Sequence, residues 1–290
     1  MDFEFVYIGN DPVMQPAVIP VLARCFEEWQ GAWERGGKFP FLELSFIARE
    51  PEQHHIIGHV GIMPFRISDG RGGIRKAAGI ASVATLPEYR GKKIAARLCT
   101  MAAEWAAQEG YDFLPLYTAF FRVYECCGWN CFHDAVLRLK KAENADGNGW
   151  RKGSELSAEE RETIRMFYET SFDFPGKVLR ADSGDFHSWE RMFREGFLLW
   201  KCTENGYAVR QENTLAELCV RPGHAAEFAV GCTDTFLPSS HPAAAELLEN
   251  GFRAYGADEP VPDIRHGECM MASPLEAVPG DFFFPLTDKF

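Results

Sequence analysis

The sequence predicts an α/β (α+β) protein of two domains, each a twisted mixed β-sheet flanked by helices. Three observations support this fold class. Helical and strand periodicities alternate along the first half, a stretch without apolar periodicity follows at 142–155, and the second half then shows a similar order of elements. We therefore expect a first domain at 1–141, a linker at 142–155 and a second domain at 156–290.

The first half begins with an amphipathic helix at 15–30, whose apolar side chains share one face. A meander of strands follows, with the turn signal DGRGG before its last strand. The elements are expected in this order: strands at 46–49, 54–67 and 74–85, a helix within 86–110, a strand at 111–118, a short helical segment at 122–127 and a strand at 131–141.

The second half starts after a linker rich in Gly, Asn, Asp and Glu. Its helices and strands are again told apart by the period of their apolar residues. We expect helices at 157–171 and 186–196, strands at 197–203, 206–211 and 215–220, a helix at 242–250 and a final aromatic strand at 281–287.

Composition and charge restrict the function. With 46% hydrophobic residues the chain can form folded cores, and 30 basic against 42 acidic residues give a net charge of −12. A nucleic-acid partner is therefore not expected, whereas a cationic small molecule would be attracted. The sequence contains no long apolar run and no export signal at the N-terminus, which predicts a cytoplasmic protein without a membrane partner.

The nine cysteines are interpreted as reduced thiols. The densest group is Cys126, Cys127, Cys131 and His133, but Cys126 and Cys127 are adjacent and no second pair has zinc-ligand spacing, so no metal is expected. A covalent acyl-cysteine route through these thiols is less favoured than direct transfer, because the sequence indicates no positioned histidine partner. We interpret His59 as a core or edge residue of a strand.

The segment with the clearest chemistry is the strand GIASVAT, the loop LPEYRGKKIAA and the start of the following helix. A helix N-terminus offers unpaired N–H groups and a positive dipole end, so a loop at this point can seat a phosphate. Arg90, Lys92 and Lys93 add positive charge, although solvated basic residues are also common at helix starts.

This segment resembles motif A of the GNAT acetyltransferase superfamily, Arg/Gln-x-x-Gly-x-Gly/Ala after a strand. Arg90 and Ala95 match the ends of the motif, and Lys93 stands where the central glycine is usual. A lysine there is expected to take an ordinary helical φ, with its side chain turned away from the anion or toward it. The resemblance implies that acetyl-CoA is bound by Ser82, Val83, Ala84, Thr85, Arg90, Gly91, Lys92, Lys93, Ile94, Ala95, Ala96, Ala119 and Phe120.

A second motif supports the same resemblance. Tyr124-Glu125-Cys126-Cys127-Gly128-Trp129 is similar to the Tyr-x-x-x-Gly-Phe element that GNAT enzymes carry after their fifth strand. The resemblance implies that Tyr124 lies at the thioester sulfur and donates a proton to the leaving thiolate. The alternative is a half-buried aromatic residue of a helix.

More narrowly, the chain resembles the enhanced intracellular survival (Eis) type of GNAT protein, through TAFFRVYECCGW, residues 174–193 and FFFPLTDKF. This implies a tandem of two GNAT-like domains, of which only the first is active. It also implies amine acetylation, with the C-terminal carboxylate, here of Phe290, as general base; the alternative is a frayed terminus. The sterol-carrier-like domain usual in that type is not expected, because the sequence leaves no room for it.

The acceptor expected from these observations is a primary amine, of the aminoglycoside, polyamine or lysine type. In GNAT proteins the first helix borders the acceptor cleft, so Glu27 and Glu28 are candidates for an acidic lining, although they also fit a solvated face. Two alternatives remain: a non-catalytic acyl-CoA-binding regulatory module and a protein-interaction scaffold. The oligomeric state is open, a homo-oligomer included.

Overall fold

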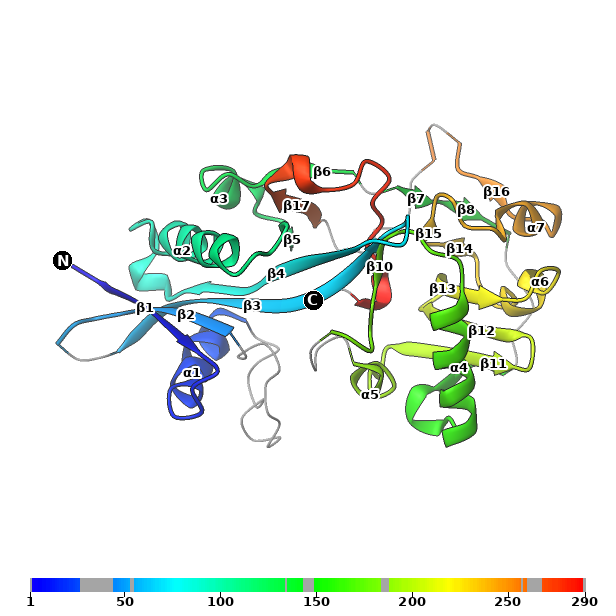
Figure 1. The fold of residues 1–290 in the computed structure, drawn as a ribbon, viewed down its shortest axis with the longest axis horizontal. Coiled ribbons are helices and arrows are strands. Elements are labelled where there is room, and N and C mark those ends of the chain that lie inside the picture. The colour runs from blue at the N-terminus through cyan, green and yellow to red at the C-terminus, as the bar shows by residue number, and fades with distance from the viewer. Residues whose placement is uncertain are drawn as a thin grey trace.

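The structure is a computed structural model that describes residues 2–26, 44–52, 55–133, 135–142, 149–183, 188–256, 258–259 and 268–288. Glu27, Glu28 and Phe290, together with residues 143–148 of the expected linker, lie outside these ranges. The predicted α/β fold class is confirmed (Figure 1). Within the described ranges, no helix has the length and apolarity needed to span a membrane.

An antiparallel meander forms the main sheet of the first half. Its strands are β1 (Glu4–Gly9), β2 (Leu44–Arg49), β3 (Ile56–Asp69) and β4 (Ile74–Thr85). The turn between β3 and β4 is closed by Asp69, whose Oδ1 accepts hydrogen bonds from the backbone N–H groups of Arg71 and Gly73, each at 2.8 Å. β3 is long enough to pair with β2 near its start and with β10 (Pro175–Val178) near its end.

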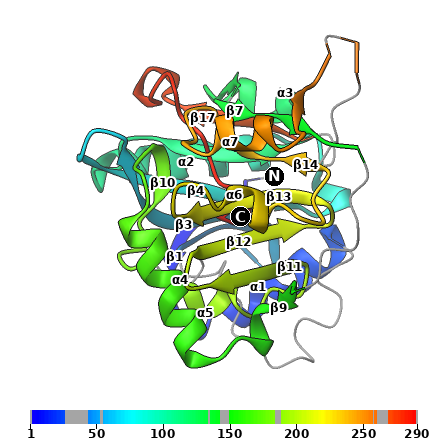
Figure 2. The same ribbon diagram turned by 90° about the vertical axis from the view of Figure 1, so that its right-hand side faces the viewer.

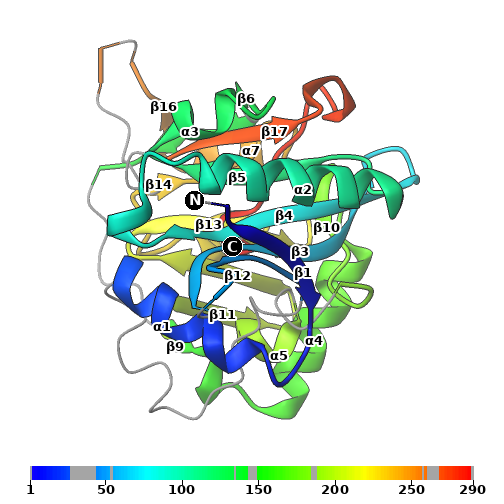
Figure 3. The ribbon, with the colours of Figure 1, turned by 90° about the vertical axis from the view of Figure 1, so that its left-hand side faces the viewer.

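Two helices cover opposite faces of this sheet, as Figures 1 and 3 show. α1 (Gln15–Cys25) buries Val18, Val21 and Leu22, while α2 (Ile94–Gln108) buries Ile94, Leu98 and Ala102. All six belong to one hydrophobic core that includes the strands between them. The expected helices at 15–30 and 86–110 are confirmed within 15–25 and 94–108.

A smaller sheet contains strands from both ends of the chain. β17 (Cys269–Ser273) lies between β5 (Leu114–Thr118) and β6 (Asn130–Phe132) and pairs antiparallel with both. In Figure 1 this strand lies beside β5 and β6, next to the short helix α3 (Phe121–Glu125). Because β10 and β17 come from beyond the expected linker and pair in the first half, the division of the chain at 142–155 stays a prediction.

The expected single strand at 131–141 is wrong. This stretch contains three short strands, β6, β7 (Val136–Leu137) and β8 (Leu139–Lys140), which pair in three different sheets. β6 pairs with β17, β7 with β15 (Leu237–Pro238), and β8 with β14 (Asp234–Thr235) and β16 (Arg253–Ala254). The chain passes here from the sheet that contains β17 to the sheet that contains β14. Each partner strand therefore pairs with at most three of its residues.

The second half is built on a seven-stranded sheet with helices on both faces (Figure 2). Tyr207 and Val209 share a core with α4 and α5, whereas Ala208 shares one with α6 and α7, as strand alternation requires. The elements not yet given are β9 (Arg151–Lys152), α4 (Ala158–Thr170), α5 (Trp189–Met192), β11 (Leu198–Thr203), β12 (Gly206–Gln211), β13 (Thr214–Val220), α6 (Ala225–Phe228) and α7 (Ala244–Glu249).

The final strand expected at 281–287 is also wrong. Phe282, Phe283 and Phe284 are buried in an extended loop, and a 3₁₀ turn, Leu286–Asp288, follows them. The backbone of this loop bonds to two separate segments: the Phe283 N–H donates to the Pro175 carbonyl at 2.9 Å, and the Phe282 carbonyl accepts from the Ala135 N–H at 2.8 Å. Because its backbone hydrogen-bond partners lie on different segments, this loop is not a strand of any β-sheet.

The alternation of these phenylalanines nevertheless has a structural role. Phe282 and Phe284 pack in one core with Phe65 and Phe113 of the first half. Phe283 belongs to a different core, which includes Phe174 and Phe236. The loop therefore packs on its two sides against different parts of the chain and connects them through apolar contacts.

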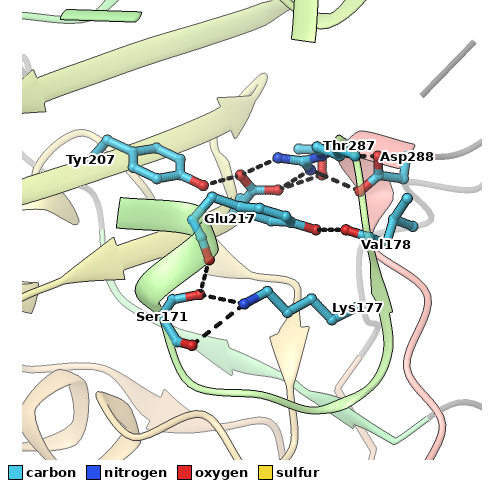
Figure 4. A network of polar contacts seen from close by, with 9 residues as sticks. Ser171, Lys177, Val178, Tyr207, Glu217, Thr287 and Asp288 are labelled. Atoms are coloured by element: carbon cyan, nitrogen blue, oxygen red, sulfur yellow. Dashed lines mark hydrogen bonds and ion pairs between the residues drawn. The ribbon is translucent and has the colours of Figure 1, made fainter. Parts of the chain in front are cut away.

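A buried polar network lies beside this loop (Figure 4). The side chain of Arg180 is 0% exposed and bonds with Nη2 to Oε2 of Glu217 at 2.5 Å and to Oδ2 of Asp288 at 2.7 Å. Tyr207 Oη donates to Glu217 at 2.6 Å, and Thr287 Oγ1 donates to the same carboxylate at 2.7 Å. This network ties the C-terminal 3₁₀ turn to β13 and to the segment that follows β10.

Candidate active site

The end of β4 departs from regular strand geometry. Gly61 pairs with Ala81 and His59 pairs with Ala84, so two residues of β4, Ser82 and Val83, lie opposite one residue of β3. This is a β-bulge, and Ser82 has φ +51°, an uncommon conformation for a residue other than glycine. Ser82 and Val83 are only partly buried, as is Ala81, whereas residues 77–80 of β4 are buried.

β4 and β5 run side by side only near their beginnings. Ala77 and Phe113 form a parallel bridge, the Ala78 N–H donates to the Phe113 carbonyl at 3.1 Å, and the Asp112 N–H donates to the Lys76 carbonyl at 2.9 Å. Within the described part of the chain no later bridge joins the two strands. Among the described residues, the edge of Ser82–Thr85 away from β3 therefore carries no bridge to another strand.

Thr85 is the last residue of β4. Its Oγ1 is buried and finds no hydrogen-bond partner among the described residues. A buried hydroxyl without a partner is unfavourable, and it gains a bond when an amide or hydroxyl group of a ligand lies along the strand. The amide-containing arm of acetyl-CoA carries groups of this kind.

The loop after β4 leads into the N-terminus of α2. Arg90 Nε donates to the Thr85 carbonyl at 3.3 Å, which holds the start of the loop against the strand. Gly91 has φ +79°, and no atom lies within 4 Å of the place where its Cβ would be. α2 has no side-chain N-cap and no acidic residue in its first turn, so protein side chains leave its N–H groups to an anion.

Basic side chains surround this helix start. The Lys92 ammonium lies 4.8 Å from the ring centre of Tyr89 and 5.6 Å from that of Phe3, and the Arg97 guanidinium lies 4.2 Å from the ring centre of Phe5. These contacts hold two cations at the beginning of α2. The positive end of the α2 dipole and the positive charges of these side chains therefore lie together at the end of the loop.

The expected conformation of Lys93 is wrong. Its backbone is left-handed, with φ +60° and ψ 22°, rather than helical. The chain must turn sharply here to enter α2, and it takes the conformation a glycine would provide although the residue carries a Cβ. A left-handed residue with a side chain is less stable by roughly 1–2 kcal/mol.

Because of this conformation, the usual order of stability of alanine and glycine variants should be reversed at position 93. We expect Lys93→Gly to be more stable toward urea unfolding than Lys93→Ala by about 0.5–1 kcal/mol, because only glycine is unstrained at positive φ. At the exposed helix position Glu104, the same pair of variants is expected in the usual order, with Ala the more stable by about 1 kcal/mol. The same order at both positions would contradict the left-handed backbone at Lys93.

Tyr124 lies on α3 and is 9% exposed. It belongs to the same hydrophobic core as Ala84 of β4 and Ile94 and Leu98 of α2. Burial, and then the nearby Cys99, raise the pKa of Tyr124 above its ordinary value of 10.0, while a hydrogen bond with Thr118 acts in the opposite direction. The phenol therefore stays protonated at neutral pH and can act as a donor.

Cys127 connects α3 to the start of α2. Its Sγ donates to the Ala96 carbonyl at 3.6 Å, and burial raises the pKa of this thiol to about 12. Cys126 Sγ is 3.7 Å from Cys127 Sγ, and Cys131 Sγ is 3.5 Å from Cys269 Sγ. All of the cysteines are free thiols, and the described ranges contain no group of three or more His, Cys, Asp or Glu side chains that could hold a metal.

The structure brings most of the predicted site residues together and leaves some apart. Ser82–Thr85 and the loop lead directly into α2, with Arg90 bonded to Thr85, and Tyr124 shares a hydrophobic core with Ala84 and Ile94. Ala119 and Phe120 follow β5, and Phe120 is 75% exposed, so they lie at the protein surface and not in the core. The predicted roles of Glu27, Glu28 and Phe290 concern residues outside the described ranges. The sequence did not indicate the bulge at Ser82, because a serine carries no signal for positive φ.

A carboxylate of the chain itself occupies the helix start that follows β13. After β13 the chain turns through residues 221–224 into α6, which is four residues long. The N–H groups of Gly223 and Ala226 donate to the two carboxylate oxygens of Glu246, each at 3.1 Å. The chain's own carboxylate thus takes the place that a phosphate would need.

Comparison with known proteins agrees with this geometry. Residues 16–132 match the model of the acetyltransferase (GNAT) domain family. The matched residues include the bulged strand, the loop, α2 and Tyr124. A comparison with curated protein sequences gave no match.

Solved structures resemble the chain over most of its length. A GCN5-related N-acetyltransferase from Kribbella flavida is 17% identical, with a TM-score of 0.62 over 93% of this chain and 70% of that chain. One from Anabaena variabilis is 15% identical, with a TM-score of 0.60 over 93% and 72%. Eis1 from Mycobacterium abscessus is 14% identical, with a TM-score of 0.52 over 81% and 65%. These similarities show that the chain has the fold of these proteins.

Proposed function

We propose that this chain, which matches the acetyltransferase (GNAT) domain family in residues 16–132, is an acetyl-CoA-dependent N-acetyltransferase that acts on a primary amine of a cationic acceptor. One observation supports the proposal: the bulged strand end Ser82–Thr85 leads through the loop Arg90–Lys93 into α2, and Tyr124 packs in the same core as Ala84 and Ile94. We propose that these parts receive the amide-containing arm, the pyrophosphate and the leaving thiolate.

Each part of the site has a separate task. Acetyl-CoA supplies an acyl group activated as a thioester. The Thr85 hydroxyl and the backbone of Ser82–Thr85 bind the arm, and the loop with the first turn of α2 binds the pyrophosphate. Backbone N–H groups of β4 polarise the carbonyl while the acceptor nitrogen forms its bond to carbon. Tyr124 donates its proton toward sulfur as the C–S bond breaks.

The acceptor side of the site is proposed from charge and from the sequence. A net charge of −12 favours cationic acceptors of the aminoglycoside, polyamine or lysine type. Glu27 and Glu28 are proposed to line the acceptor cleft, and the carboxylate of Phe290 is proposed as the base that takes a proton from the amine. Such a base is needed because an amine with a pKa of about 10 arrives protonated at neutral pH.

We propose further that coenzyme binds only in the first domain, at 1–141, and that the second domain, at 156–290, has a structural role in a tandem of two GNAT-like units. The carboxylate of Glu246 supports this assignment, since it accepts the N–H groups at the start of α6 where an anion would otherwise bind. The second domain then contributes a wall of the acceptor cleft.

The experiment that tests the function is CoA thiol release from acetyl-CoA, with and without a panel of polyamines, aminoglycosides and lysine peptides. We expect release that depends on the amine, together with a product heavier by one acetyl group. Release without any amine dependence would point to hydrolysis and contradict the proposal.

The alternative function is a non-catalytic acyl-CoA-binding regulatory module, which is motivated by Lys93 at the glycine position of the loop. It predicts saturable acetyl-CoA binding, measured by calorimetry, and no release with any member of the panel. A third possibility, an interaction scaffold, predicts that acetyl-CoA does not raise the melting temperature.

A further inference from the structure

A buried histidine lies directly beside the bulge of β4. His59 of β3 is 0% exposed. Its neighbour Gly58 faces α2, because an added Cβ there would lie 2.7 Å from Cγ2 of Ile94. Side chains alternate along a strand, so His59 projects from the opposite face, the one that α1 covers.

Both ring nitrogens of His59 have partners. Nδ1 lies 2.9 Å from the carbonyl oxygen of Ser82, and Nε2 lies 3.0 Å from Oγ of Ser45. A carbonyl can only accept, so Nδ1 carries the proton and donates it, while Nε2 accepts from the serine hydroxyl. Burial lowers the pKa of His59 to about 4, so the ring is neutral in the physiological range.

The bond to Ser82 acts on the bulge itself. A strand residue with φ +51° persists only where its surroundings fix it, and the His59 donor fixes the carbonyl of that residue. Because the peptide unit is planar and trans, the direction of this carbonyl also sets the direction of the Val83 N–H on the other side of the unit. The ring therefore controls how the following residues of β4 present their backbone.

We infer that His59 is a positioning residue for the acyl transfer: its hydrogen bond to the Ser82 carbonyl holds the bulge, and through it the backbone of Ser82–Thr85, in the orientation that receives the thioester. The inference rests on the proposed N-acetyltransferase function. His59 does not touch the substrate, since it lies on the other face of the sheet and acts through Ser82.

The composition of the surrounding core supports this role. Ile47, the partner of His59 on β2, is fully buried and apolar. An apolar residue at position 59 would fill this space without the desolvation that a polar ring requires. What only a polar ring provides here is a donor aimed at Ser82 and an acceptor for Ser45.

The test compares three variants of the full chain by steady-state kinetics, CoA binding and thermal unfolding. His59→Leu removes the donor, and His59→Asn keeps an N–H donor close to the position of Nδ1. Ser45→Ala removes the hydroxyl on the far side of the ring and leaves the bond to Ser82 in place. We expect His59→Leu to lower kcat by roughly tenfold or more, the scale of effect that a small misplacement of reacting groups produces. Its CoA dissociation constant should change by less than about twofold, because the loop and α2 bind the pyrophosphate.

His59→Asn should recover most of kcat. Ser45→Ala should lower the melting temperature and keep kcat, because the bond to Ser82 remains. Equal kcat for wild type and His59→Leu overturns this inference alone, and so does an equal loss in His59→Leu and His59→Asn, which would indicate a purely structural role. A wild-type chain that releases no CoA with any amine overturns the proposed function and this inference together.

Discussion

Arg180→Met is expected to lower the free energy of unfolding by about 3–5 kcal/mol, the range measured when one partner of a buried ion pair is removed. Arg180 faces two carboxylates, and the side chains of Glu217 and Asp288 are 9% and 0% exposed. Without the guanidinium both charges remain in the interior and lose the cation that lies between them. Urea unfolding at neutral pH measures the loss.

Two controls separate charge burial from a general effect of losing an arginine. Arg165 also forms ion pairs, with Glu162 and Glu190, but its side chain is 31% exposed and theirs are 74% and 65% exposed. Arg165→Met should therefore cost less than about 1 kcal/mol. Combining Arg180→Met with Glu217→Gln and Asp288→Asn should recover part of the loss, because no charge is then left unpaired. Equal losses for Arg180→Met and Arg165→Met would contradict the closed network.

The same network shows why parts of the fold could not be predicted from the sequence. Arg180 is 37 residues from Glu217 and 108 from Asp288 along the chain, and no local pattern indicates such a partnership. β17 is similar: its place between β5 and β6 depends on a segment more than a hundred residues away. The side chains of Phe282–Phe284 alternate between two cores as in a strand. Their backbone hydrogen bonds, however, go to two different segments and not to one partner strand.

Local features were predictable because their cause lies within a few residues. The apolar periodicity of α1, α2 and α4 reports the face that each helix buries, and the structure confirms these helices. The loop from Arg90 to Lys93 follows from a strand, a glycine and a helix start in direct succession. The bulge at Ser82 is different, because its geometry depends on His59 across the sheet.

Tyr124→Phe is expected to lower kcat by about 10²-fold, the lower end of what general acid catalysis contributes. The variant removes one hydroxyl and keeps the aromatic ring in its core, so the fold and the CoA dissociation constant should change little. Because burial raises the pKa of Tyr124 above 10.0, this phenol should cause no loss of rate in the wild type below that pH. Steady-state kinetics with the amine acceptor and calorimetry with CoA measure the two quantities.

Tyr111→Phe is the matched control, because it removes a phenol from the opposite end of α2. Tyr111 is partly buried beside Trp105, with a distance of 5.7 Å between ring centres, and its backbone N–H bonds to the Ala106 carbonyl at 2.9 Å. It lies away from the loop and the bulge, so its loss should leave kcat unchanged. A Tyr124→Phe enzyme as fast as wild type would remove the donor role from Tyr124 and leave protonation of the thiolate to solvent. A fall in CoA affinity equal to the fall in kcat would instead assign Tyr124 to coenzyme binding.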